Sequence, residues 1–174
     1  MSARRSTARV LVVSTTLGLL AHACSAPVAD DRIVVHAPGS APFKNVGLLL
    51  DTRCGSLDCH GSMSRNLRLY GKEGLRLDPT GLPGASDTTQ DELDLDYRAV
   101  VGLEPEVMRV VVAEHGAHPE RLILIRKARG TEKHLGGTMM QPGDDEDLCV
   151  TSWLAGKVDD DACARAIAII DPPP

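Results

Sequence analysis

Apolar residues along the chain recur mostly at the spacing of amphipathic helices. In residues 43–50, Phe43, Val46 and Leu50 fall on one side of a helix, which predicts a helix that turns this side toward a core. Three further stretches carry apolar patterns: residues 93–101, residues 119–129 and the β-branched run 108–112. The first two are predicted to be helical, and the third fits a helix or a strand equally well. Residues 78–91, rich in Pro, Gly and Thr, are predicted to form a loop.

Two more helices are predicted near the C-terminus, each with an acidic start. Residues 144–147 place negative charge at the positive end of the first helix, and Gly156 ends it. Its expected core surface comes from Leu148, Val150, Trp153 and Leu154. The second helix is predicted over residues 159–170. The acidic cluster lacks the alternating ligand spacing of a calcium loop, so we interpret it as a solvated helix start.

The N-terminus has the pattern of a signal peptide, predicted over residues 1–23. Three arginines precede an apolar stretch of about a dozen residues, which is too short for a permanent membrane span of about 20 residues. Residues 24–41 are rich in Ala, Pro, Gly, Asp and Ser and are predicted to be a flexible tether. The chain is therefore expected to be exported, to the periplasm or to the outer membrane or cell surface.

Cys24 stands at the predicted cleavage site. The run from Leu20 to Cys24 resembles the lipobox of bacterial lipoproteins, although Ala21 and His22 depart from its usual pattern. Five cysteines are an odd number for an exported chain, where a free thiol is a liability. Lipidation of Cys24 would leave two natural pairs, so a lipoprotein attached to the membrane is favoured over plain secretion.

The net charge and the aromatic content of the chain indicate which partners and ligands it would suit. The 19 basic and 24 acidic side chains give a net charge of −5, and removal of the signal peptide with its three arginines makes the charge −8. Such a surface repels nucleic acid and is steered toward basic patches on partner proteins. Large aromatic side chains are scarce, with only Phe43, Tyr70, Tyr97 and Trp153. A buried macrocycle would supply apolar volume that these residues do not.

The chemistry of the chain centres on Cys54, Cys59 and His60. A Cys-x-x-Cys-His motif attaches a c-type haem, and here the gap between the cysteines is four residues. Two thiols can form thioethers to the two haem vinyl groups, and the next residue then supplies an imidazole to the iron. Gly55 and Ser56 suit a loop that bulges between the two sulfurs. The alternatives are a small disulfide-closed loop, and a zinc site completed by another histidine.

The segment from Cys54 to Gly61 resembles the attachment segment of c-type cytochrome-like domains of some environmental bacteria. The preceding helix, the Gly-Leu-Arg-Leu passage that ends at residue 77, and the segments 134–144 and 153–156 are similar to the same domains. The resemblance covers roughly residues 42–157. It implies an all-α, cytochrome c-like domain, residues 42–172, wrapped around one haem c. The four-residue gap is the departure from the family pattern.

The resemblance also implies a sixth iron ligand from a loop before the last helix. Class I cytochromes usually present a methionine there, and Met140, next to a Pro-Gly turn, is the preferred candidate. Met139 and His134 are the alternatives. His115 and His118 are expected in an exposed turn.

Cys149 and Cys163 fall on the two predicted C-terminal helices. In an oxidising compartment they are expected to form a structural disulfide.

One-electron transfer without enzymatic activity is the expected function, with redox proteins as partners and haem c as the cofactor. A haem peroxidase or a haem-based sensor is the second hypothesis. Either normally needs an open iron position, which a bound Met140 would occupy. A disulfide-stapled binding module without haem is the third.

Overall fold

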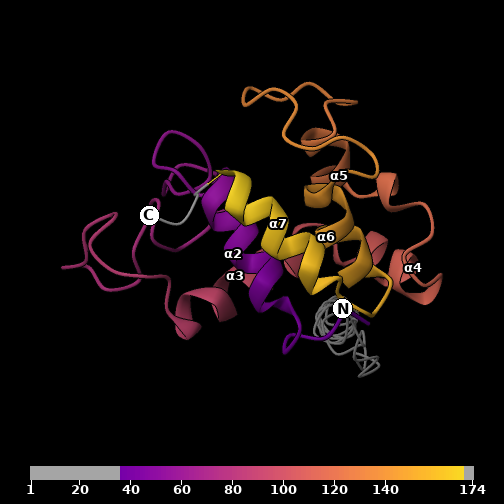
Figure 1. The fold of residues 1–174 in the computed structure, drawn as a ribbon, viewed down its shortest axis with the longest axis horizontal. Coiled ribbons are helices and arrows are strands. Elements are labelled where there is room, and N and C mark those ends of the chain that lie inside the picture. Colours follow the sequence, from indigo (N-terminus) through magenta and orange to yellow (C-terminus); the bar gives the residue numbers. More distant parts are fainter. Residues whose placement is uncertain (1–35, 171–174) are drawn as a thin grey trace, which may run out of the picture. The chain divides into compact units, whose positions relative to one another are not determined.

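The computed structural model describes residues 36–170, and this part contains six α-helices and one 3₁₀ turn but no β-strand. The elements, in chain order, are α2 (Phe43–Cys54), α3 (Gln90–Leu103), α4 (Pro105–Ala113), η1 (Pro119–Arg121), α5 (Ile123–Ala128), α6 (Asp145–Leu154) and α7 (Asp160–Ile170) (Figure 1). The expectation of an all-α fold is confirmed. The predicted signal peptide, Cys24 and the tether up to residue 35 lie outside the described residues. Within residues 36–170, no helix is long and apolar enough to cross a membrane.

Helix α2 packs against α3, α6 and α7 (Figure 1). Its predicted apolar side is buried, with Phe43, Val46 and Leu50 all inside the core. The Phe43 ring meets Tyr97 of α3 and Trp153 of α6, with ring centroids 5.6 Å and 5.1 Å apart. Three of the four aromatic side chains therefore form one cluster at the start of α2.

This aromatic cluster also binds the end of the predicted tether. The Tyr97 hydroxyl donates to the carbonyl of Pro38 at 2.9 Å, and Trp153 Nε1 donates to the carbonyl of Gly39 at 3.0 Å. Both donors come from the buried face of the domain, where an unpaired polar group is costly. The last residues of the predicted tether thus belong to the domain.

The middle of the chain differs from the sequence prediction at one point. The ambiguous run 108–112 is helical within α4, with Met108 and Val111 buried. The single helix predicted over residues 119–129 is wrong, because Leu122 is extended, at ψ 133°, between η1 and α5. The carboxylate of Glu104 accepts the backbone N–H of Ile123 and so caps α5 at this break.

The two C-terminal helices form over the predicted segments, but the acidic start of α6 is not solvated throughout, because Asp147 is buried and pairs with Arg129 at 2.8 Å. Asp144 caps α6 by accepting the backbone N–H of Asp147 at 2.8 Å, and Gly156, at φ 89°, lies just beyond the end of α6. Of the four expected core residues, Leu148 is the exception, since it is 39% exposed. Cys149 and Cys163 are joined in a disulfide that links α6 to α7, as expected.

We expect replacement of this disulfide to lower the stability of the domain. A double variant, Cys149→Ala with Cys163→Ala, should lose about 3 kcal/mol of unfolding free energy, because the crosslink closes a loop with a sequence separation of 14. Chemical denaturation of oxidised protein measures this. Reductant should destabilise the wild type by a similar amount and leave the double variant unchanged, and a double variant as stable as the wild type would contradict the expectation.

Candidate haem attachment site

The segment after α2 turns back on itself, so that Cys54 and His60 come together. Cys54 is the last residue of α2, and its carbonyl accepts the backbone N–H of His60 at 2.9 Å. Inside this turn the carbonyl of Ser56 accepts the N–H groups of Cys59 and Gly61, each at 2.9 Å. The four-residue gap is therefore a closed, hydrogen-bonded turn.

Glycines fix the path of this turn. A Cβ added to Gly61 would lie 1.8 Å from the carbonyl oxygen of Gly55, and one added to Gly74 would lie 2.0 Å from the same oxygen. Three backbone segments thus meet at distances that only glycine permits. This close approach gives a physical reason for the glycine after His60 and for the glycine of the Gly-Leu-Arg-Leu passage.

Cys54 and Cys59 are free thiols, in contrast to the disulfide-bonded Cys149 and Cys163. Cys54 packs against the hydrophobic core. Burial raises the pKa of the Cys54 thiol to about 11, although the nearby charge of Arg53 opposes this shift. At neutral pH the Cys54 side chain is therefore a protonated thiol.

The His60 ring is oriented by the backbone. Its Nδ1 lies 3.0 Å from the carbonyl oxygen of Leu67. A carbonyl oxygen only accepts hydrogen bonds, so Nδ1 carries the proton and the lone pair of the neutral ring is on Nε2. This is the arrangement by which proteins orient a metal-binding histidine.

A second histidine from the loop between α5 and α6 lies next to His60. The rings of His60 and His134 have centroids 6.0 Å apart and planes inclined by 25°. In Figure 1 this loop extends from α5 toward the segment that follows α2. His134 is an alternative to Met140 among the predicted sixth ligands, and its ring contacts that of His60.

The two methionines of the same loop lie against the core. Met140 is only 5% exposed and is a member of the buried hydrophobic cluster, while Met139 packs against that cluster. The backbone N–H groups of both residues donate to the carbonyl of Ala128, at 2.8 Å and 3.1 Å. Arg53 of α2 donates to the carbonyl of Met139 through Nε and Nη2, at 3.2 Å and 3.1 Å, and so binds the loop next to Cys54.

His115 and His118 are exposed and lie in the turn between α4 and η1, as expected, each with φ 54°.

Exposed apolar side chains flank the histidines and the cysteines. Leu57 and Met63 are 55% and 61% exposed, and Leu135, next to His134, is 88% exposed. These three residues are neighbours of the cysteines, His60 and His134 in sequence.

Three buried carboxylates, which sequence analysis overlooked, hold the loop that follows the turn. Asp51 accepts the backbone N–H groups of Lys72 and Glu73 and the hydroxyl of Thr88. Burial raises the pKa of Asp51, because its desolvation outweighs these hydrogen bonds. An acid beside the buried residues of an amphipathic helix was the signal that could have revealed Asp51.

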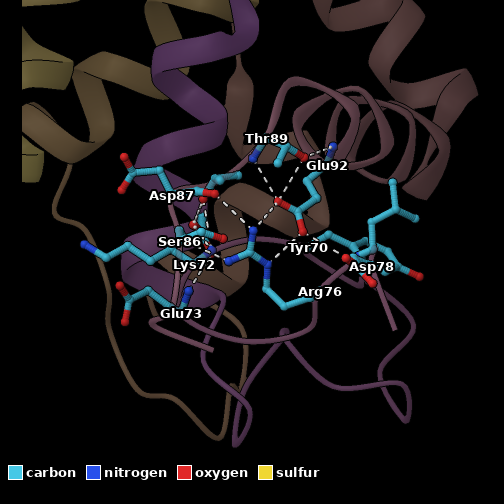
Figure 2. A network of polar contacts seen from close by, with 12 residues as sticks. Tyr70, Lys72, Glu73, Arg76, Asp78, Ser86, Asp87, Thr89 and Glu92 are labelled. Carbon is cyan, nitrogen blue, oxygen red and sulfur yellow. Dashed lines mark hydrogen bonds and ion pairs between the residues drawn. The ribbon is translucent and has the colours of Figure 1, made fainter. Parts of the chain in front are cut away.

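Glu92 holds the far end of the same loop (Figure 2). Its carboxylate binds Arg76 through both oxygens, at 2.9 Å and 3.0 Å, and accepts the backbone N–H of Leu77 at 3.0 Å. Glu92 and Thr89 also form a capping box at the start of α3. Burial alone would raise the pKa of Glu92, but the hydrogen bonds from Thr89, Leu77 and Arg76 outweigh it and hold the pKa below its ordinary value.

Asp96 is the third carboxylate. Its Oδ1 accepts the backbone N–H of Tyr70 at 2.7 Å, whereas its buried Oδ2 has no hydrogen-bond partner among the described residues. Burial raises the pKa of Asp96 to about 8; the hydrogen bond from Tyr70 opposes the shift, and the charges of Asp51 and Glu92 add to it. At neutral pH Asp96 is therefore largely protonated.

Among residues 36–170, no three His, Cys, Asp or Glu side chains are grouped so that they could hold a metal ion. No protein-family model, no curated protein and no solved structure matches the chain.

Asp96 should make stability depend on pH. The folded protein keeps this proton up to about pH 8, whereas the unfolded chain loses it near pH 3.8, so the Asp96 contribution to stability is lost as pH rises between these values. Asp96→Asn keeps an oxygen for Tyr70 and stays neutral. As pH rises across this window, we expect the unfolding free energy of the wild type to fall relative to that of Asp96→Asn. Denaturation at several pH values measures both free energies.

The matched control is Asp94→Asn, because Asp94 is exposed on the same helix. It should keep the pH profile of the wild type. Parallel profiles for wild type and Asp96→Asn would contradict a raised pKa.

The glycine contacts yield a second test. Gly61→Ala should destabilise the domain by about 3 kcal/mol or more, because the added methyl overlaps the Gly55 carbonyl. Gly102→Ala is the control, since Gly102 is exposed in α3 and its added Cβ has no neighbour within 4 Å. Its stability should be unchanged or raised by up to about 1 kcal/mol. Equal stabilities in a denaturant titration would contradict the close approach.

Proposed function

We propose that this chain is a monohaem c-type cytochrome that transfers single electrons at the cell envelope. Cys54 and Cys59 would bind the haem covalently, and His60 would ligate its iron through Nε2. The observation that carries the proposal is the closed turn itself. It brings two free thiols together with an imidazole whose Nδ1 is already bound to the carbonyl of Leu67.

The attachment chemistry needs only groups that the chain and the haem bring. Each thiol would add its S–H across one vinyl double bond, so that the sulfur bonds to one carbon and the hydrogen goes to the other. No electron is lost, and no further oxidant is required. The bound iron supplies a ferric–ferrous couple. The chain orients His60, provides apolar cover and holds the attachment turn in place.

The disulfide-stapled alternative is less well supported. Cys149 and Cys163 are paired, but Cys54 and Cys59 are not, although both pairs are close in sequence. The Cys149–Cys163 disulfide fits an oxidising compartment and so supports export. Membrane attachment through Cys24, and redox partners with basic patches that suit the acidic chain, complete the proposal.

We expect the protein to carry covalent haem when it is produced together with a bacterial haem-attachment system. A denaturing gel stained for haem peroxidase activity should show a coloured band for the wild type. The double variant Cys54→Ala with Cys59→Ala should lose this colour, because a denatured protein keeps its haem only when thioether bonds hold it.

The matched control removes the other cysteine pair. Cys149→Ala with Cys163→Ala should keep the stained band, because those residues lie outside the attachment turn. A colourless wild-type band, with Cys54 and Cys59 joined in a disulfide, would end the cytochrome proposal in favour of the binding module.

A further inference from the structure

We propose that His134, and not Met140 or Met139, would be the second protein ligand of the haem iron, together with His60. This inference rests on the proposed function. It assigns the site a pair of imidazoles, where the family resemblance implies an imidazole and a thioether.

A backbone carbonyl orients each of the two histidine rings in the same way. His134 Nδ1 lies 3.2 Å from the carbonyl oxygen of Gly137, as His60 Nδ1 lies 3.0 Å from that of Leu67. Each carbonyl can only accept, so each ring carries its proton on Nδ1 and its lone pair on Nε2. Neither Nε2 has a hydrogen-bond partner in the part of the chain that the structure describes. Two half-buried imidazoles thus offer the donor atom that a metal binds.

The two rings lie close to each other. Their centroids are 6.0 Å apart and their planes are inclined by 25°, so the rings are stacked. Ordinary ring pairs have this separation. What distinguishes this pair is that a backbone carbonyl holds the Nδ1 atom of each ring.

The loop that carries His134 is constrained on both sides. The N–H of Gly137 donates to the carbonyl of His134 at 3.1 Å, and Gly137 has a φ of 76°, which favours glycine. Before His134, the Lys127 side chain donates to the carbonyl of Lys133 at 3.0 Å. After it, Arg53 binds the carbonyl of Met139. The backbone on either side of His134 is thus tied to α5 and to the end of α2.

The methionines are placed differently. Met140 is a buried member of the core, so its thioether would have to leave apolar packing to reach an iron beside His60. Met139 also packs against this core. Neither carries the orienting contact that both histidines have.

The ferric spectrum of the full-length, haem-loaded protein tests the inference. We expect a low-spin, six-coordinate spectrum without a methionine–iron charge-transfer band. His134→Ala should convert it to a high-spin spectrum, and added imidazole should restore the low-spin form. His134→Met should raise the midpoint potential, because a thioether raises the potential relative to a second imidazole.

Three control variants separate His134 from its neighbours. Met140→Leu and Met139→Leu should keep the wild-type spectrum, as should His118→Ala, which removes an exposed histidine. A thioether band that Met140→Leu or Met139→Leu abolishes would overturn the inference and leave the cytochrome proposal intact. A five-coordinate wild type, or a His134→Ala variant that stays low-spin, would overturn it as well. A wild type without covalent haem would overturn the proposed function and this inference together.

Discussion

The buried carboxylate of Asp51 holds together the three segments on which the candidate site depends. It lies in the last turn of α2, close to Cys54, and binds the backbone of the loop after His60 as well as Thr88, just before α3. A buried carboxyl group is costly unless hydrogen bonds satisfy it, so these segments must fold together. The glycine contacts beside it leave the Cys54–His60 turn a single path. The geometry of the site is therefore set by polar and steric contacts at the edge of the core.

The helices that the sequence predicted well are those with a clear apolar spacing or an acidic start. Helices α2, α3, α6 and α7 all match their predicted segments, because burial of one side and capping of one end are local properties. The break at Leu122 could not be predicted in this way. Its capping carboxylate comes from Glu104, which lies 19 residues from Ile123 in sequence. The run 108–112 was ambiguous for a related reason, since packing decides the structure of short β-branched segments.

The residues of the candidate site also differ in how well the sequence predicts them. The cysteine pair and His60 could be singled out from the sequence, because the proposed attachment chemistry requires those residue types in that order. The approach of His134 could not, since it depends on two loops that meet only after α2, α5 and α6 have packed. The preference for Met140 followed the family resemblance, whereas the structure uses Met140 as a core residue.

The most direct test of the central claim is the mass of the tryptic peptide that runs from Cys54 to Arg65. Trypsin releases this peptide by cleavage after Arg53 and Arg65, so it contains both candidate thioether cysteines and His60. For protein matured with a haem-attachment system, the peptide should carry the mass of one haem, with no thiol left to alkylate. A peptide with the bare sequence mass, whether as two free thiols or as one disulfide, would contradict covalent haem attachment.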